Sequence, residues 1–144
     1  MTRHFSHLTG AVIGVMLTAV ASESQAQKAF SKLSVATDST YGYVDTNPVK
    51  LKKGGREKSI LQEMNYLSGL STSDKQPLVL LHRTSVLDPG YKEPLLKDLS
   101  SQRGGLLDKY VFLTANTKDT ITLFIDIYSK GPVSLPVGLT YELP

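Results

Sequence analysis

The clearest hydrophobic pattern in the chain is a strict alternation near its C-terminal end, between Thr120 and Tyr128. Successive side chains of a strand point to opposite faces, so a period of two predicts a strand with one face packed on a core. The apolar face holds Ile121, Leu123, Ile125 and Ile127, and the other face holds Thr120, Thr122, Phe124, Asp126 and Tyr128.

A second strand is predicted immediately upstream, over Leu106–Ala115, with Asn116–Asp119 as the connecting loop. Two such runs joined by a short polar loop are typical of a β-hairpin. If the hairpin closes symmetrically around this loop, Asp108 and Asp126 lie near each other across the ladder, where neighbours come within about 5 Å.

One helix is predicted over Arg56–Leu70, because Ile60, Met64 and Leu67 recur at i, i+4 and i+7. This spacing is the stripe by which a helix packs on a core. Leu61 and Leu70 flank the stripe, and Lys58, Gln62 and Asn65 fall on the far side.

The short apolar run Leu78–Leu81 follows Pro77 and predicts a buried strand. The expected fold is therefore α+β, with one amphipathic helix packed on a mostly antiparallel sheet of four or five strands. Residues 40–144 are expected to form a single domain. Residues 27–39 are polar with scattered apolar positions and are interpreted as an N-terminal tether or a loosely docked strand.

The first 26 residues have the pattern of a signal peptide. Arg3 gives a basic start, residues 8–20 are uncharged, and Ser24-Gln25-Ala26 fits a small-x-small cleavage site. The alternative is a short membrane anchor, but the uncharged run is about 13 residues long and a spanning helix needs about 20. We expect a periplasmic or secreted protein, with no stable membrane insertion after cleavage.

Composition removes several kinds of chemistry. The chain has no cysteine, which excludes disulfides, thiolate metal sites and a cysteine nucleophile. His82 is the one histidine beyond the predicted signal peptide, so a multi-histidine metal site is excluded, and no metal or cofactor is expected. The net charge of +3 is mild and no nucleic-acid module is recognisable, so we expect no nucleic-acid partner.

A basic run between Lys50 and Lys58 surrounds Gly54-Gly55. It is interpreted as a solvated edge and loop rather than a phosphate site, because the rest of a phosphate-loop pattern is missing.

Few side chains are candidates for catalysis. Asp108 and Asp126, if adjacent, could form an acid/base pair or bind a hard cation such as calcium. His82 could act as a general base, with Ser85 and Asp88 each three residues further on, but no Gly-x-Ser-x-Gly nucleophile elbow occurs. Isolated residues of this kind are more often structural, so no catalytic residue is assigned.

Aromatic side chains offer a candidate binding face instead. Tyrosines with apolar rings and polar tips suit sugar or peptide ligands, although half-buried tyrosines of a sheet give the same pattern. The partner of such a face would be a protein, a peptide or a glycan. The candidate ligand-binding residues are Tyr41, Tyr43, Asn47, Asp108, Tyr110, Asp126 and Tyr128.

Several short signals, taken in order, carry a family resemblance. They are Tyr41-Gly42-Tyr43, Asn47-Pro48-Val49-Lys50, Tyr66-Leu67, the run 104–110, the run 123–128 and the run 136–139. Over about residues 41–139 the chain resembles a family of small exported bacterial proteins of unknown function. Some members are labelled 2-dehydro-3-deoxyphosphooctonate aldolase. That label implies an enzyme resembling a barrel of about 250 residues, which is more than twice the expected length of the mature chain.

Two functions remain open from the sequence. The first is an exported, non-catalytic binding or interaction module in the periplasm or outside the cell. The alternative is a small extracytoplasmic hydrolase or transferase that uses Asp108, Asp126 or His82.

Overall fold

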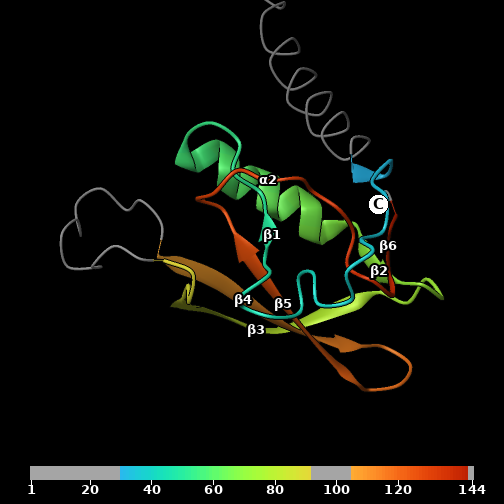
Figure 1. Cartoon of the computed structure of the whole chain (residues 1–144). Coiled ribbons are helices and arrows are strands. Elements are labelled where there is room, and N and C mark those ends of the chain that lie inside the picture. Colours follow the sequence, from blue (N-terminus) through green and yellow to red (C-terminus); the bar gives the residue numbers. More distant parts are fainter. Residues whose placement is uncertain (1–29, 92–104, 143–144) are drawn as a thin grey trace, which may run out of the picture.

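The computed structural model describes residues 30–91 and 105–142. A single described helix, α2 (Arg56–Ser68), lies over a four-stranded sheet with the strand order β1-β5-β4-β3 (Figure 1). These strands are β1 (Val49–Lys50), β3 (Leu78–Leu87), β4 (Leu106–Thr114) and β5 (Thr120–Asp126). A separate two-stranded sheet pairs β2 (Leu70–Thr72) with β6 (Leu139–Tyr141). The α+β prediction is confirmed; the main sheet is mixed, because β1 runs parallel to β5.

The hairpin of β4 and β5 forms where the sequence predicts it. Tyr110 pairs with Leu123 and Asp108 pairs with Ile125 in an antiparallel register. Both Leu123 and Ile125 are fully buried, at 0% exposure, which confirms the facing inferred from the alternation. The strand ends at Asp126, whose Oδ1 accepts hydrogen bonds from the backbone N–H groups of the next turn, at Tyr128 (2.7 Å) and Ser129 (2.9 Å).

Helix α2 buries a different face from the predicted one. Its buried side chains are Ser59, Glu63, Asn65 and Tyr66, whereas Met64 is 62% exposed and Leu61 is also exposed. The ring of Tyr66 meets Phe30 edge to face at 5.4 Å between centroids, and its hydroxyl donates to the Ser134 carbonyl at 2.8 Å. These contacts set the rotation of the helix, so Ile60 and Leu67 lie at the margin of the core.

Strand β3 is an edge strand, and the prediction of a buried strand at residues 78–81 is wrong. Leu80 is 51% exposed, and Val79 and Leu81 are exposed to a similar degree. Among the described strands of the main sheet it pairs only with β4, and its register shifts between Leu80 and His82. The apolar run therefore lies at the border of the sheet, where β4 covers one side of its backbone.

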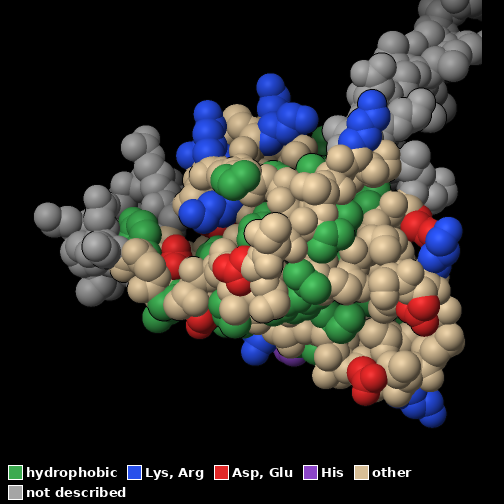
Figure 2. All heavy atoms as spheres, turned by 45° about the vertical axis from the view of Figure 1, so that its right-hand side comes forward, with side chains coloured by type: hydrophobic (Ala, Val, Ile, Leu, Met, Phe, Trp, Pro, Cys, Tyr) green, Lys and Arg blue, Asp and Glu red, His purple; other side chains and the backbone are tan. Residues whose placement is uncertain are grey.

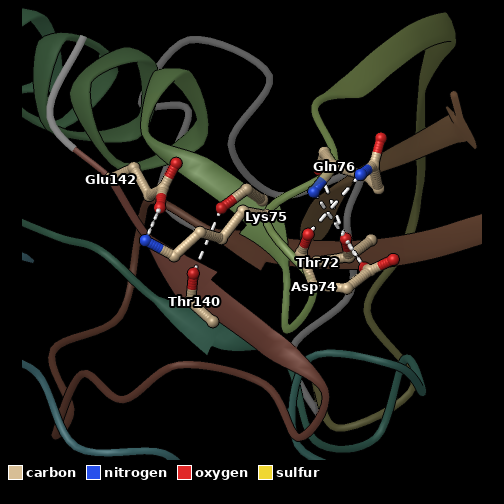
Figure 3. A network of polar contacts seen from close by, with 7 residues as sticks. Thr72, Asp74, Lys75, Gln76, Thr140 and Glu142 are labelled. Carbon is tan, nitrogen blue, oxygen red and sulfur yellow. Dashed lines mark hydrogen bonds and ion pairs between the residues drawn. The ribbon is translucent and has the colours of Figure 1, made fainter.

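The β2–β6 ladder is held by a compact group of polar contacts (Figure 3). Lys75 forms an ion pair with Glu142 at 3.2 Å, and the hydroxyl groups of Ser71 and Thr140 lie 3.1 Å apart. In the turn after β2, the hydroxyl of Thr72 bonds to the Asp74 carboxylate and accepts the Gln76 N–H at 2.9 Å. These contacts close the turn that returns the chain toward β3.

The segment predicted as a tether or loosely docked strand is described from Phe30 onward, and most of its residues are exposed. Phe30 is buried among the core aromatics, and Val35 forms a parallel bridge with Leu135. The predicted signal peptide and its cleavage site lie outside the described residues. Among the helices that the structure describes, none is both long enough and apolar enough to cross a membrane.

Candidate functional site

The predicted site residues separate into two regions of the molecule. Tyr41, Tyr43 and Asn47 lie in the loop before β1, on the side of the C-terminal segment 132–137. Asp108 and Tyr110 lie in β4, beneath α2 (Figure 1). The candidate face that the sequence assembled from all of them is therefore not formed as one surface.

The tyrosines near residue 40 act as braces for the segment 132–137. The hydroxyl of Tyr43 donates to the Val137 carbonyl at 2.6 Å. The hydroxyl of Tyr41 donates to the Pro132 carbonyl at 3.3 Å and accepts the Ser134 N–H at 3.2 Å. Burial raises the pKa of both tyrosines. Their polar tips are thus used within the fold.

Asn47 and Tyr128 also have structural contacts. The Asn47 side-chain amide donates to the Asp38 carboxylate and to the Thr40 hydroxyl, both at 3.0 Å. These bonds close the loop that contains Gly42, whose φ of +79° is the left-handed region that favours glycine. The ring of Tyr128 packs at the border of the core.

Asp108 and Asp126 do not form a pair. The observed register sets Asp108 opposite Ile125, one position from Asp126, so the two carboxylates point to opposite faces of the sheet. Asp126 is bound to its own turn, as described above. The expected pairing of Asp108 with Asp126 is therefore wrong by one residue.

His82 lies apart from the side chains considered with it. His82 pairs with Val111 and Arg83 with Tyr110, so His82 faces away from the side that carries Asp108. Ser85 pairs with Asp108 and donates its hydroxyl to Asp108 Oδ1 at 3.2 Å. The described geometry therefore does not assemble His82 with Ser85.

A polar cluster forms instead under α2, from three elements. We call it the Glu63 cluster; it consists of Glu63 from α2, Arg83 and Ser85 from β3, and Asp108 and Tyr110 from β4. Arg83 Nη2 donates to Asp108 Oδ2 at 2.8 Å and lies 3.7 Å from Glu63 Oε2. One guanidinium nitrogen thus serves two carboxyl groups, with a hydrogen bond to Asp108 and a longer contact to Glu63.

Glu63 is the unusual member of the cluster. It is 1% exposed, and its Oε1 has no hydrogen bond of good geometry from any residue that the structure describes. Burial, followed by the negative charge of Asp108, raises the pKa of Glu63 from 4.5 to about 7, although Arg83 and Tyr110 act in the opposite direction. Burial also raises the pKa of Tyr110. The environment disfavours charge on Glu63.

Arg83 connects this cluster with the surface. Its side chain is 49% exposed, and its guanidinium carbon lies 5.4 Å from the centroid of the Tyr110 ring. The hydrogen bond to Asp108 raises the pKa of Arg83 further above its usual value, so the guanidinium stays charged. The exposed charged group of the cluster is thus the Arg83 guanidinium in β3, whereas the carboxyl groups of Glu63 and Asp108 are buried.

Sequence reasoning missed Glu63 and Arg83. It placed Glu63 on no face of the helix and gave Arg83 no role. A charged residue at i−3 from a buried tyrosine is the available signal for Glu63, since Glu63 and Tyr66 share a helix face. The pairing of Arg83 with Asp108 depends on strand register, which the sequence does not specify.

The basic side chains on the surface gather away from the middle of the face drawn in Figure 2. Figure 2 shows Lys and Arg side chains along the upper rim of the view, while the middle of that face carries mostly hydrophobic and uncharged side chains. Within the described part of the chain, no group of three or more His, Cys, Asp or Glu residues is placed to hold a metal ion.

No family model, curated protein or solved structure matches the chain.

Proposed function

We propose that the chain is an exported, non-catalytic binding module that acts in the periplasm or outside the cell, and that β3 is its binding edge. The observation that carries this proposal is the exposure of a ten-residue edge strand with large apolar side chains. The other edge of the main sheet, β1, has only two residues. Long apolar edge strands are unusual on proteins that remain without a partner.

The partner that fits this edge is an extended, uncharged segment of another protein. An added strand would bond to the outer backbone groups of β3, and its apolar side chains would cover Val79 and Leu80. Residues 78–87 contain no acidic side chain, and their one arginine is already paired with Asp108. An uncharged strand therefore matches the edge better than a charged one.

A second copy of this chain fits less well. An antiparallel pair formed about the middle of β3 would set Arg83 of one copy beside His82 of the other. Two cationic side chains would then adjoin at the centre of the interface whenever the imidazole is protonated. The register shift between Leu80 and His82 would also fall at this centre.

The test uses a blocked ten-residue peptide of alternating valine and threonine, with amide chemical shifts of the chain as the readout. We expect shift changes concentrated in residues 78–87, and weaker binding in Leu80→Lys. Met64→Lys is the matched control, because it makes a similar change at an exposed apolar residue of α2. A peptide with proline at its centre should bind less, since proline removes a ladder hydrogen bond.

Two results would count against this assignment. Shift changes outside β3, or none, would remove β3 as the binding edge. A dimer mass in light scattering that is lost in Leu80→Lys would assign the edge to a second copy instead.

Export is tested separately by intact mass. Protein recovered from the periplasm or the medium should begin at or near Gln27, as the small-x-small pattern predicts. Protein that remains in the cytoplasm with Met1 in place would contradict export and leave the binding edge to be judged by the peptide experiment.

The alternative, a small extracytoplasmic hydrolase or transferase, gains one observation. Glu63 and Asp108 are neighbouring acids in different environments, an arrangement that enzymes use to separate an acid from a base. Against it, Glu63 is 1% exposed and so does not meet a substrate in this conformation. A broad hydrolase screen decides: activity lost in Asp108→Asn or Glu63→Gln and kept in Asp126→Asn would favour the enzyme.

A further inference from the structure

The Glu63 cluster contains two carboxyl groups, those of Glu63 and Asp108, and one cation, the Arg83 guanidinium. Asp108 receives two hydrogen bonds, from Arg83 Nη2 at 2.8 Å and from the Ser85 hydroxyl at 3.2 Å. Glu63 has the longer contact of 3.7 Å with the same nitrogen, and its Oε1 lacks a donor of good geometry among the described residues. The two carboxyl groups are therefore unequal, and Asp108 is the better supported as an anion.

The position of Glu63 in the helix explains why it cannot escape to water. It lies four residues after Ser59 and three before Tyr66, and all three side chains are buried against the sheet. The charged groups that face it are Arg83 from β3 and Asp108 from β4, and Tyr110 from β4 adds a hydroxyl. An isolated buried carboxylate is costly, so a group in this position tends to become neutral.

We infer that the Glu63 cluster binds one proton in the folded chain and acts as a pH-sensitive switch, with Glu63 as the proton-holding group. With the proton bound, the cluster is neutral overall, because the charges of Asp108 and Arg83 cancel. When the proton leaves, a second buried negative charge appears beside Asp108. Water must then reach Glu63, and α2 is the element whose contact with β3 and β4 loosens.

The direction of the pH effect follows from proton linkage. The pKa of Glu63 is higher in the folded chain, at about 7, than its ordinary value of 4.5. The folded chain therefore holds the proton more tightly, and the contribution of Glu63 to stability is greatest below pH 4.5. It falls as the pH rises through the interval from 4.5 to 7 and is lost above that interval.

The first experiment measures urea unfolding of the full chain between pH 5 and pH 9. Between these limits the Glu63 titration should increase the unfolding equilibrium constant on the order of 50- to 100-fold. Glu63→Gln should remove this part of the pH dependence. Glu57→Gln, the same change at an exposed position of the same helix, should retain it. Equal pH dependence in Glu63→Gln and the wild type would overturn the inference.

The second measurement does not depend on a variant that folds. The ¹³C shift of the Glu63 carboxyl carbon in the wild-type chain should titrate with a midpoint near 7. Amides of α2 should also exchange faster with solvent above that pH than the intrinsic increase with pH requires. A midpoint at the ordinary glutamate value would show that Glu63 is ionised in the folded chain at neutral pH, and the switch would be rejected.

Discussion

Truncation of Leu123 to alanine tests the packing of the main sheet most directly. The side chain is 0% exposed and lies in β5, opposite Tyr110 of β4, on the face of the sheet that carries the Glu63 cluster. Loss of a buried leucine side chain costs about 2–5 kcal/mol, because transfer energy is lost and a cavity remains. We expect a loss within this range, since the side chain is fully buried.

The effect should be large compared with the stability of the domain, which is about 5–15 kcal/mol for proteins of this kind. With a urea m-value of about 2 kcal/mol/M, in the middle of the usual range for small domains, the unfolding midpoint should fall by about 1–2.5 M. Circular dichroism across a urea titration measures the change.

Leu87 provides a matched control for this prediction. It is a leucine in a strand of the same sheet, but it is 62% exposed. Leu87→Ala should change the free energy of unfolding by no more than about 0.5 kcal/mol. If the two alanine variants shift the midpoint equally, the assignment of Leu123 to the buried face is wrong, and the inferred depth of the core is wrong with it.

Three further changes test individual contacts. Tyr66→Phe should destabilise by about 1–3 kcal/mol in denaturant titrations, because the Ser134 carbonyl loses its donor; an unchanged midpoint would contradict that contact. Asp126→Ala should accelerate hydrogen exchange of the Tyr128 and Ser129 amides, which donate to Asp126 Oδ1, and unchanged protection would contradict these two hydrogen bonds. Gly69→Ala should lower the melting temperature in calorimetry, because its Cβ would lie 2.3 Å from a ring atom of Tyr141; a neutral result would mean that the ring moves aside easily.

The β4–β5 hairpin could be predicted because its signal is local. The alternation from Thr120 onward specifies which side chains are buried, and a polar loop marks the turn. The expected pairing of Asp108 with Asp126 was wrong by one residue, because the sequence does not specify at which residue of the polar loop the two strands stop pairing. A shift of one residue exchanges the faces of a strand, and this is why Asp108 and Asp126 are separated.

The facing of α2 could not be predicted from apolar spacing. Met64 fits the hydrophobic stripe, but the helix is rotated about its axis so that the larger Tyr66 is buried. Glu63 lies on the same helix face and is therefore buried as well. The partners that make this burial acceptable, Arg83 and Asp108, come from strands distant in the sequence. Likewise, the apolar run of β3 does not indicate whether the strand is central or at an edge, since strand order is a property of the whole sheet.

Arg83 belongs to both the proposed proton switch and the proposed binding edge, so the two should be coupled. A strand added at β3 would cover part of the exposed Arg83 side chain and remove water from the Glu63 cluster. Lower hydration favours the neutral form of Glu63, and linkage requires that a ligand which favours proton binding is itself favoured by the proton. The valine–threonine peptide should therefore bind more tightly at pH 6 than at pH 8, and Glu63→Gln should reduce this difference. Isothermal titration at the two pH values measures this difference, and tighter binding by the wild type at pH 8 would show that ionised Glu63 favours the open edge.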